Sequence, residues 1–181
     1  MKALWLMAIA LWAPTASAED SVTVCFNYGC QRQETVRYSD VQLQSVRDRL
    51  ATASNAEDER KALAQAVGHL YGWAAEQTPI GGDRGGNLAD EGREGRMDCI
   101  DHSTTADRLL HMIERHGWLR FHRVQDRVLR RRFLVMEHWS AVIEDRSGKR
   151  FVVDSWFGGA LKPPLIMALE EWLAGGGEIV E

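Results

Sequence analysis

The apolar pattern of this chain changes its period at Gly117. Before this glycine, apolar residues recur at the three- and four-residue spacing of helices, and after it they alternate with polar residues as in strands. Another alternating pattern lies near the N-terminus, at 22–24 and 36–38. The order of hairpin, helices and antiparallel strands predicts an α+β fold rather than repeated βαβ units. The 181 residues suit one such domain, at residues 19–181.

Three helices are predicted in the first two thirds of the chain. Ser39 and Gln42 form a capping-box pattern at the start of the first helix, and Asn55 with Asp58 starts the second. These two helices are expected to be scaffold. The third is predicted over Asp98–His116 and ends at the glycine that follows.

The alternating segments predict four strands, and a closing helix follows them. The strands are expected at Trp118–Val124, Val128–Val135, Glu137–Glu144 and Arg150–Asp154, and the helix at Ile166–Leu173. A polar turn containing a glycine, at 145–149, joins the last two strands, which should therefore be neighbours. His122 is expected to face solvent from its strand.

The first eighteen residues have the pattern of a signal peptide. Lys2 precedes the apolar run Ala3–Ala13, and Ala16-Ser17-Ala18 is the small-residue pattern that signal peptidase cleaves. Cleavage is expected after Ala18, which predicts a periplasmic or secreted protein without stable membrane insertion. The formal net charge of −4 argues against a nucleic-acid partner.

The three cysteines divide into a pair and a single residue. Cys25 and Cys30 flank a short segment of turn formers in the predicted hairpin, and in an oxidising compartment this spacing predicts a disulfide. A metal-binding pair is the alternative, but the sequence has no second cysteine pair to complete four ligands. Cys99 is left as an unpaired thiol, which in an oxidising compartment has to be either buried or used in the protein's function.

A glycine-rich segment, 79–96, ends just before Asp98 and Cys99. Irregular loops of this length in a compact domain are usually functional or mobile, and a flexible connector is the alternative interpretation. Asn87 and Gln77, in or next to this segment, are candidate donors to an oxyanion.

Cys99 is expected in the first turn of the third helix, with Asp98 as the N-cap. Free backbone N–H groups and the positive end of the helix dipole favour a thiolate there, as a nucleophilic cysteine requires. Such a nucleophile needs a histidine for proton transfer and a third residue that orients the histidine. His138 and Asp154 can supply this pair only if the turn between their strands has an odd number of residues, because side chains alternate between faces.

The stretch from Met97 to Trp156, with a cysteine at a helix start and then His138 and Asp154 on neighbouring strands, resembles the transglutaminase-like branch of the papain-like cysteine peptidases. The resemblance implies a papain-like core with Cys99 as nucleophile, His138 as general acid and base, and Asp154 as its orienting residue. Members of this superfamily hydrolyse or transfer amide bonds through a thioester, without a metal or other cofactor. A peptide or protein substrate, including one of the cell envelope, is therefore expected.

Nearby residues leave alternatives open. His102, three residues further along the same helix, is a rival partner for the thiol and, like Asp98, a candidate for the substrate site. Trp139 and Trp156 flank the candidate histidine and aspartate as further substrate-site candidates. Trp156 should share the face of the aspartate and shield its bond to the histidine.

The thiol also has interpretations without catalysis. It can be an inert core cysteine, or a metal ligand together with Asp101, His102 and another histidine, although no recognised ligand spacing supports a metal. The basic cluster between Arg123 and Arg132 is expected to be a solvated face, with an anionic polymer as the alternative partner. The expected function is that of an exported thiol-dependent amide hydrolase or acyltransferase. The alternative is a catalytically inactive envelope protein that keeps the fold for binding.

Overall fold

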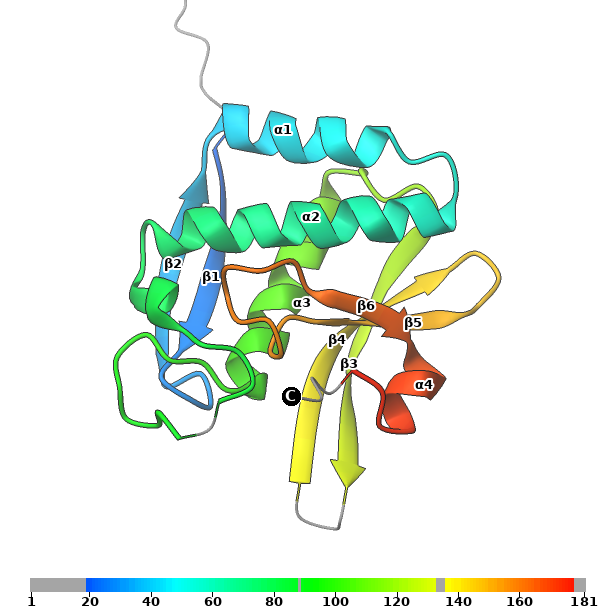
Figure 1. The fold of residues 1–181 in the computed structure, drawn as a ribbon. Helices are drawn as coiled ribbons and strands as arrows, with labels where there is room; N and C mark the ends of the chain where they lie inside the picture. The colour runs from blue at the N-terminus through cyan, green and yellow to red at the C-terminus, as the bar shows by residue number, and fades with distance from the viewer. Residues whose placement is uncertain (1–18, 88, 133–135, 178–181) are drawn as a thin grey trace, which may run out of the picture.

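The computed structural model describes residues 19–87, 89–132 and 136–177 (Figure 1). The predicted signal peptide lies outside these residues, and no described helix is long and apolar enough to cross a membrane. The elements follow the chain as β1 (Asp20–Phe26), β2 (Arg32–Tyr38), α1 (Asp40–Ala51), α2 (Ala56–Ala75), a 3-10 turn (Pro79–Gly82), α3 (Cys99–Arg115), β3 (His122–Arg132), β4 (Met136–Asp145), β5 (Arg150–Asp154), β6 (Leu165–Ala168) and α4 (Leu169–Leu173).

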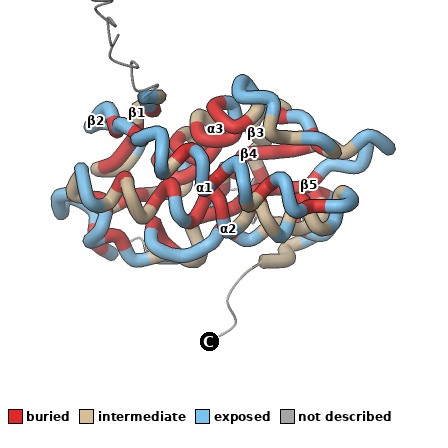
Figure 2. The backbone as a smooth tube through the Cα atoms, turned by 90° about the horizontal axis from the view of Figure 1, so that it is seen from above, coloured by how far each residue is buried: buried red, intermediate tan, exposed pale blue. Residues whose placement is uncertain are grey.

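The strands form two antiparallel sheets, which confirms the α+β class. β1 pairs with β2, and the second sheet has the order β3-β4-β5-β6. Helix α3 contacts both sheets and lies between them in Figure 1. α1 and α2 pack side by side, and their outward turns are exposed, whereas α3 and the middle of β4 are buried (Figure 2).

The core of the molecule forms around the apolar face of α3. Leu109 and Ile113 of this helix pack in one cluster with Val24 of β1, Leu70 of α2 and Ile143 of β4. Full burial of such a side chain stabilises the fold by about 1.5–3 kcal/mol, so this shared cluster fixes α3 against both sheets.

The predicted starts of the scaffold helices are confirmed. The Ser39 hydroxyl accepts the backbone N–H of Gln42, whose side chain accepts the Ser39 N–H in return, which completes the capping box. The Asn55 side chain accepts the backbone N–H of Asp58 at 2.9 Å. These caps satisfy N–H groups that the first turn of a helix leaves free.

The strand predictions after Gly117 are wrong in one respect. The structure has a single strand over His122–Arg132, where the sequence pattern suggested two, Trp118–Val124 and Val128–Val135; residues 133–135 of the second lie outside the described part. The register against β4 shifts between Gln125 and Val128. A bulge interrupts the alternation of side chains without ending the strand, so the residues between the two predicted strands belong to the same strand.

The closing helix is shorter than expected. Leu165–Ala168 forms strand β6 beside β5, and only Leu169–Leu173 is helical, although the sequence pattern favoured a helix over Ile166–Leu173. Short apolar runs fit either a helix or a strand, and here pairing with β5 makes the first part of the run a strand.

His122 is buried, so the expectation that it faces solvent is wrong. Its Nδ1 lies 2.7 Å from Oε2 of Glu59, and both side chains have no exposed surface. The Glu59 carboxylate also accepts the backbone N–H groups of Arg120 and Phe121. Glu59, the partner of His122, lies on α2, far away in the sequence. A buried carboxylate requires hydrogen-bond donors to offset the cost of its burial.

Candidate functional site

Cys99 is the first residue of α3, as the sequence predicts. The Asp98 side chain accepts the Asp101 N–H at 2.9 Å, and the Asp101 side chain accepts the Asp98 N–H at 3.2 Å. This reciprocal cap fixes the backbone on both sides of the half-buried Cys99.

His138 and Asp154 share one face of the sheet. Glu144 pairs with Arg150, so residues 145–149 form the turn between β4 and β5, and the odd number of residues confirms the parity that the pairing requires. The two side chains meet with 2.7 Å between Nε2 of His138 and Oδ2 of Asp154, and both are buried.

Asp154 is held by two further donors. Its Oδ2 accepts the indole N–H of Trp172 at 2.9 Å, and its Oδ1 accepts the backbone N–H of Trp156 at 3.2 Å. Three donors on one carboxylate fix its orientation.

Aromatic rings surround the imidazole of His138. The ring centroids of Trp156, Phe157 and Trp172 lie 4.9, 5.1 and 5.4 Å from that of His138. They exclude water from the bond between His138 and Asp154, which strengthens its electrostatic component. Trp156 has the shielding position that the sequence predicts.

The second ring nitrogen of His138 is not used within the described part of the chain. Nδ1 is buried and has no hydrogen-bond partner there. Because Nε2 bonds to a carboxylate, we assign the proton of the neutral ring to Nε2, which leaves a lone pair on Nδ1. A buried acceptor without a partner is costly, and here it is available to take a proton.

The sulfur of Cys99 lies against the β4 backbone on both sides of His138. Its Sγ is 3.8 Å from the carbonyl oxygen of Glu137, and the backbone N–H of Trp139 points to the same atom. The start of α3 therefore brings the thiol to the strand segment that carries the histidine.

The expectation that the helix start favours a thiolate is wrong for the resting site. Burial raises the pKa of the Cys99 thiol; the Trp139 N–H opposes this shift, and the Asp98 and Asp154 carboxylates add to it. Desolvation disfavours the charged form more strongly than the N–H groups of Trp139 and of Cys99 itself stabilise it. The thiol therefore needs a base to become a nucleophile.

His102 does not share the position of His138. Its ring is buried, with Nδ1 3.0 Å from Oγ of Ser155 and Nε2 2.9 Å from Oδ2 of Asp83. Asp83 also accepts the backbone N–H of Met97 at 2.9 Å. His102 thus joins the glycine-rich segment to α3 and to the end of β5, and both of its ring nitrogens are engaged away from Cys99.

The two candidate oxyanion donors bond to backbone groups. The Gln77 side chain exchanges hydrogen bonds of 3.0 Å with the N–H and the carbonyl of Arg37, and the Asn87 side chain accepts the N–H of Ala89 at 2.8 Å. The backbone N–H of Cys99, the first residue of α3, is a further candidate donor to an oxyanion.

Trp139 lies beside a partly buried arginine. The Arg127 guanidinium is 5.5 Å from the centre of the Trp139 ring and donates to the hydroxyls of Ser103 and Thr104 on α3. Arg130 is buried on another face, over the ring of Trp172. The basic cluster is therefore not one solvated face, because burial separates its members.

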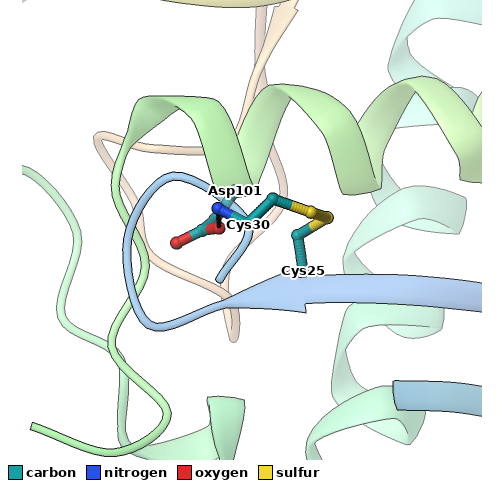
Figure 3. Close-up of side chains that lie close together, drawn as sticks. All are labelled: Cys25, Cys30 and Asp101. Carbon is teal, nitrogen blue, oxygen red and sulfur yellow. Dashed lines mark hydrogen bonds between the residues drawn. A yellow bond between two sulfur atoms is a disulfide. The ribbon is translucent and has the colours of Figure 1, made fainter. Parts of the chain in front are cut away.

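One group of possible metal ligands occurs in the described residues: Cys25, Cys30 and Asp101 (Figure 3). The two sulfurs form the predicted disulfide, and the Asp101 carboxylate accepts the backbone N–H groups of Cys30 and Tyr28. The ligand atoms are thus engaged within the protein. The alternative metal set of Cys99, His102 and Asp101 is also dispersed, since each residue has other partners.

Sequence reasoning missed Asp83, Ser155, Phe157 and Trp172. Ser155 and Phe157 lie close to Asp154 in the sequence, and this proximity was a usable signal. Trp172 follows the unpredicted strand β6 and had no such signal.

Comparison with protein-family models, curated proteins and solved structures finds no match for this chain. The candidate chemistry rests on the chain's own residues.

Proposed function

We propose that the chain is a thiol-dependent amide hydrolase or acyltransferase with a papain-like, transglutaminase-like core. Cys99 is the nucleophile, His138 the general acid and base, and Asp154 the residue that orients His138. The observation that carries this proposal is the buried His138–Asp154 pair: within the described residues Nδ1 of His138 has no hydrogen-bond partner, and the residues before and after His138 contact the Cys99 sulfur.

The proposed route of the proton follows from this geometry. His138 Nδ1 takes the proton of the Cys99 thiol as the sulfur attacks a substrate carbonyl, and Asp154 stabilises the imidazolium that forms. His138 then protonates the leaving amine, and a thioester remains on Cys99. Water completes hydrolysis, whereas a second amine completes transfer. Because burial raises the pKa of the thiol, the base is essential for attack.

The substrate class follows from the chemistry and from the predicted export. A thioester route serves peptide bonds and side-chain amides, so the substrate is a peptide or protein of the cell envelope or its surroundings. A periplasmic or secreted location agrees with the Cys25–Cys30 disulfide, because such bonds persist in oxidising compartments. The proposed reaction uses no metal or organic cofactor.

Two properties of Cys99 favour a second candidate, a binding protein that retains this fold without turnover. The raised pKa of Cys99 and its contacts with the β4 backbone are also those of an inert, buried thiol. The two candidates differ in whether His138 controls the reactivity of the sulfur.

Alkylation of Cys99 distinguishes them. Native oxidised protein is treated with iodoacetamide at pH 6–7, and the adduct is located by mass spectrometry. We expect His138→Ala to slow labelling by at least about tenfold, while His69→Ala, an exposed histidine of α2, leaves the rate unchanged. Equal slow labelling in all three proteins contradicts the enzyme and favours the binding protein.

A further inference from the structure

The loop between β1 and β2 has an unusual backbone. Four consecutive residues, Asn27, Tyr28, Gly29 and Cys30, have φ of 65°, 63°, 60° and 59°. Glycine adopts this left-handed region readily and asparagine tolerates it, so Tyr28 and Cys30 are the two residues held there against their preference. The disulfide from Cys25 to Cys30 closes the loop, and other contacts must hold its conformation.

Those contacts are the carboxylates at the start of α3. The backbone N–H groups of Tyr28 and Cys30 donate to Oδ2 and Oδ1 of Asp101 at 2.8 and 2.6 Å. The N–H of Gly29 donates to Oδ2 of Asp98 at 2.9 Å. The left-handed turn points successive N–H groups to one side, the arrangement that binds an anion, and here the anions belong to the protein itself.

The same carboxylates cap the helix of the candidate nucleophile. Asp98 and Asp101 exchange hydrogen bonds around Cys99, so the loop and the helix start share their acceptors. Two carboxylates this close repel each other, and the loop's N–H groups offset that repulsion. Without them, the cap that fixes the Cys99 backbone is left with two poorly compensated charges.

The loop also holds the chain just before Cys99. The Asn27 N–H donates to the Arg96 carbonyl at 2.7 Å, and the Asn27 side chain accepts the Gly95 N–H at 2.8 Å. The Tyr28 hydroxyl donates to Oδ1 of Asp90 at 2.8 Å. The disulfide loop therefore fixes both the end of the glycine-rich segment and the first turn of α3.

We propose that Asp101 and the disulfide loop are positioning elements for Cys99, and that reduction of the Cys25–Cys30 bond lowers the reactivity of the Cys99 thiol. This inference rests on the proposed function. Asp101 contacts no substrate atom in this scheme; it acts through the helix start.

The reduction is an ordinary dithiol exchange. A thiolate of an external dithiol attacks the sulfur of Cys30, because Cys30 is only half-buried whereas Cys25 has no exposed surface. Cys25 leaves as a thiolate, and the Arg108 guanidinium, 3.3 Å from its sulfur, stabilises the negative charge. The second thiol of the reductant then displaces Cys30. Two electrons and two protons pass to the protein, and the reductant becomes a disulfide.

The experiment measures the rate of Cys99 alkylation by iodoacetamide as a function of pH. Asp101→Asn keeps the size of the side chain but replaces one accepting oxygen by a donor, and Asp107→Asn on the same helix is the matched control. Cys25→Ser/Cys30→Ser opens the loop without a reductant. Wild-type protein with and without a phosphine reductant needs no substitution, and it keeps the test valid if a variant fails to fold. Near-UV circular dichroism checks the fold of each sample.

We expect Asp101→Asn, the open-loop variant and reduced wild type each to alkylate about fivefold or more slowly at pH 7, with a shifted pH midpoint, while Asp107→Asn matches wild type. Because the loop and Asp101 share the hydrogen bonds from Tyr28 and Cys30, combining their substitutions should cost less than the sum of the separate losses. Wild-type rates and midpoints in the folded variants, or fully additive losses, overturn the inference. The His138→Ala variant, measured in the same series, tests the proposed function separately. If it does not slow the labelling of Cys99, the proposed enzyme is rejected. The pH midpoints of the loop variants still show whether the loop positions Cys99.

Discussion

The indole nitrogen of Trp172 donates to the same carboxylate oxygen of Asp154 that receives the imidazole of His138, at 2.9 and 2.7 Å. Trp172 comes from α4, at the end of the described chain, and is fully buried. Its ring packs with Val152 and Leu169, and Arg130 lies over its face, 4.4 Å from the ring centre. The short C-terminal helix is thus a structural part of the candidate site.

Replacing Trp172 by phenylalanine removes the donor and keeps most of the apolar ring. A hydrogen bond to a charged group contributes about 1.5–3 kcal/mol, so we expect the His138-dependent alkylation of Cys99 to fall roughly tenfold or more. Trp118→Phe is the control, because Trp118 stacks on His116 and is not among the described donors to Asp154. Unchanged alkylation in folded Trp172→Phe would show that the two remaining donors suffice to orient Asp154.

The pH dependence of Cys99 reactivity is the second prediction. Burial raises the pKa of the thiol, so a sulfur without a base becomes reactive only as the pH rises above the ordinary thiol range. Transfer of its proton to His138 should make wild-type Cys99 reactive at lower pH. We therefore expect the alkylation profile of His138→Ala to move towards alkaline pH, measured as rate constants between pH 5 and 10. Coincident profiles would mean that the thiol and the imidazole are not coupled.

The third prediction concerns His102, which bonds to Ser155 and Asp83 in the interior. His102→Ala leaves a buried carboxylate and a buried hydroxyl without this partner, at a cost of about 3 kcal/mol in the free energy of unfolding. Denaturant titration measures it as a lower midpoint at an unchanged slope. His69→Ala, at an exposed position, should stay within about 0.5 kcal/mol of wild type. A similarly small effect in His102→Ala would show that the network stabilises little.

Local signals predicted the parts of the site that depend on neighbours in the sequence. Asp98 as the cap of the helix that begins at Cys99 follows from residue types at the helix start, and the pairing of His138 with Asp154 follows from the parity of one short turn. The disulfide of Cys25 with Cys30 follows from spacing in a hairpin.

The predictions that were wrong or missing concern contacts between segments that are distant in the sequence. Glu59 binds His122 from α2, and Asp83 binds His102 from the glycine-rich segment, and neither partner leaves a periodic signal. The raised pKa of Cys99 has the same origin, because burial depends on tertiary packing that a helix start does not reveal. Buried polar groups find partners wherever the chain brings donors and acceptors together.

Asp101 gives the fourth prediction. Burial, and after it the charge of Asp98, raises the pKa of its carboxyl to about 6, although backbone N–H groups oppose the shift. The folded protein therefore binds this proton more tightly than the unfolded chain does, and the resulting stabilisation is complete below about pH 4 and is lost as the pH rises through about 6. We expect wild type to lose about 1–2 kcal/mol relative to Asp101→Asn over this interval, after allowance for solvent screening. Denaturant unfolding of both proteins from pH 4 to 7 measures the difference, from which the carboxyl groups that do not interact with Asp101 cancel. A constant difference across this range would mean that the loop's N–H groups keep the carboxylate ionised throughout, and that Asp98 and Asp101 are better compensated than their separation suggests.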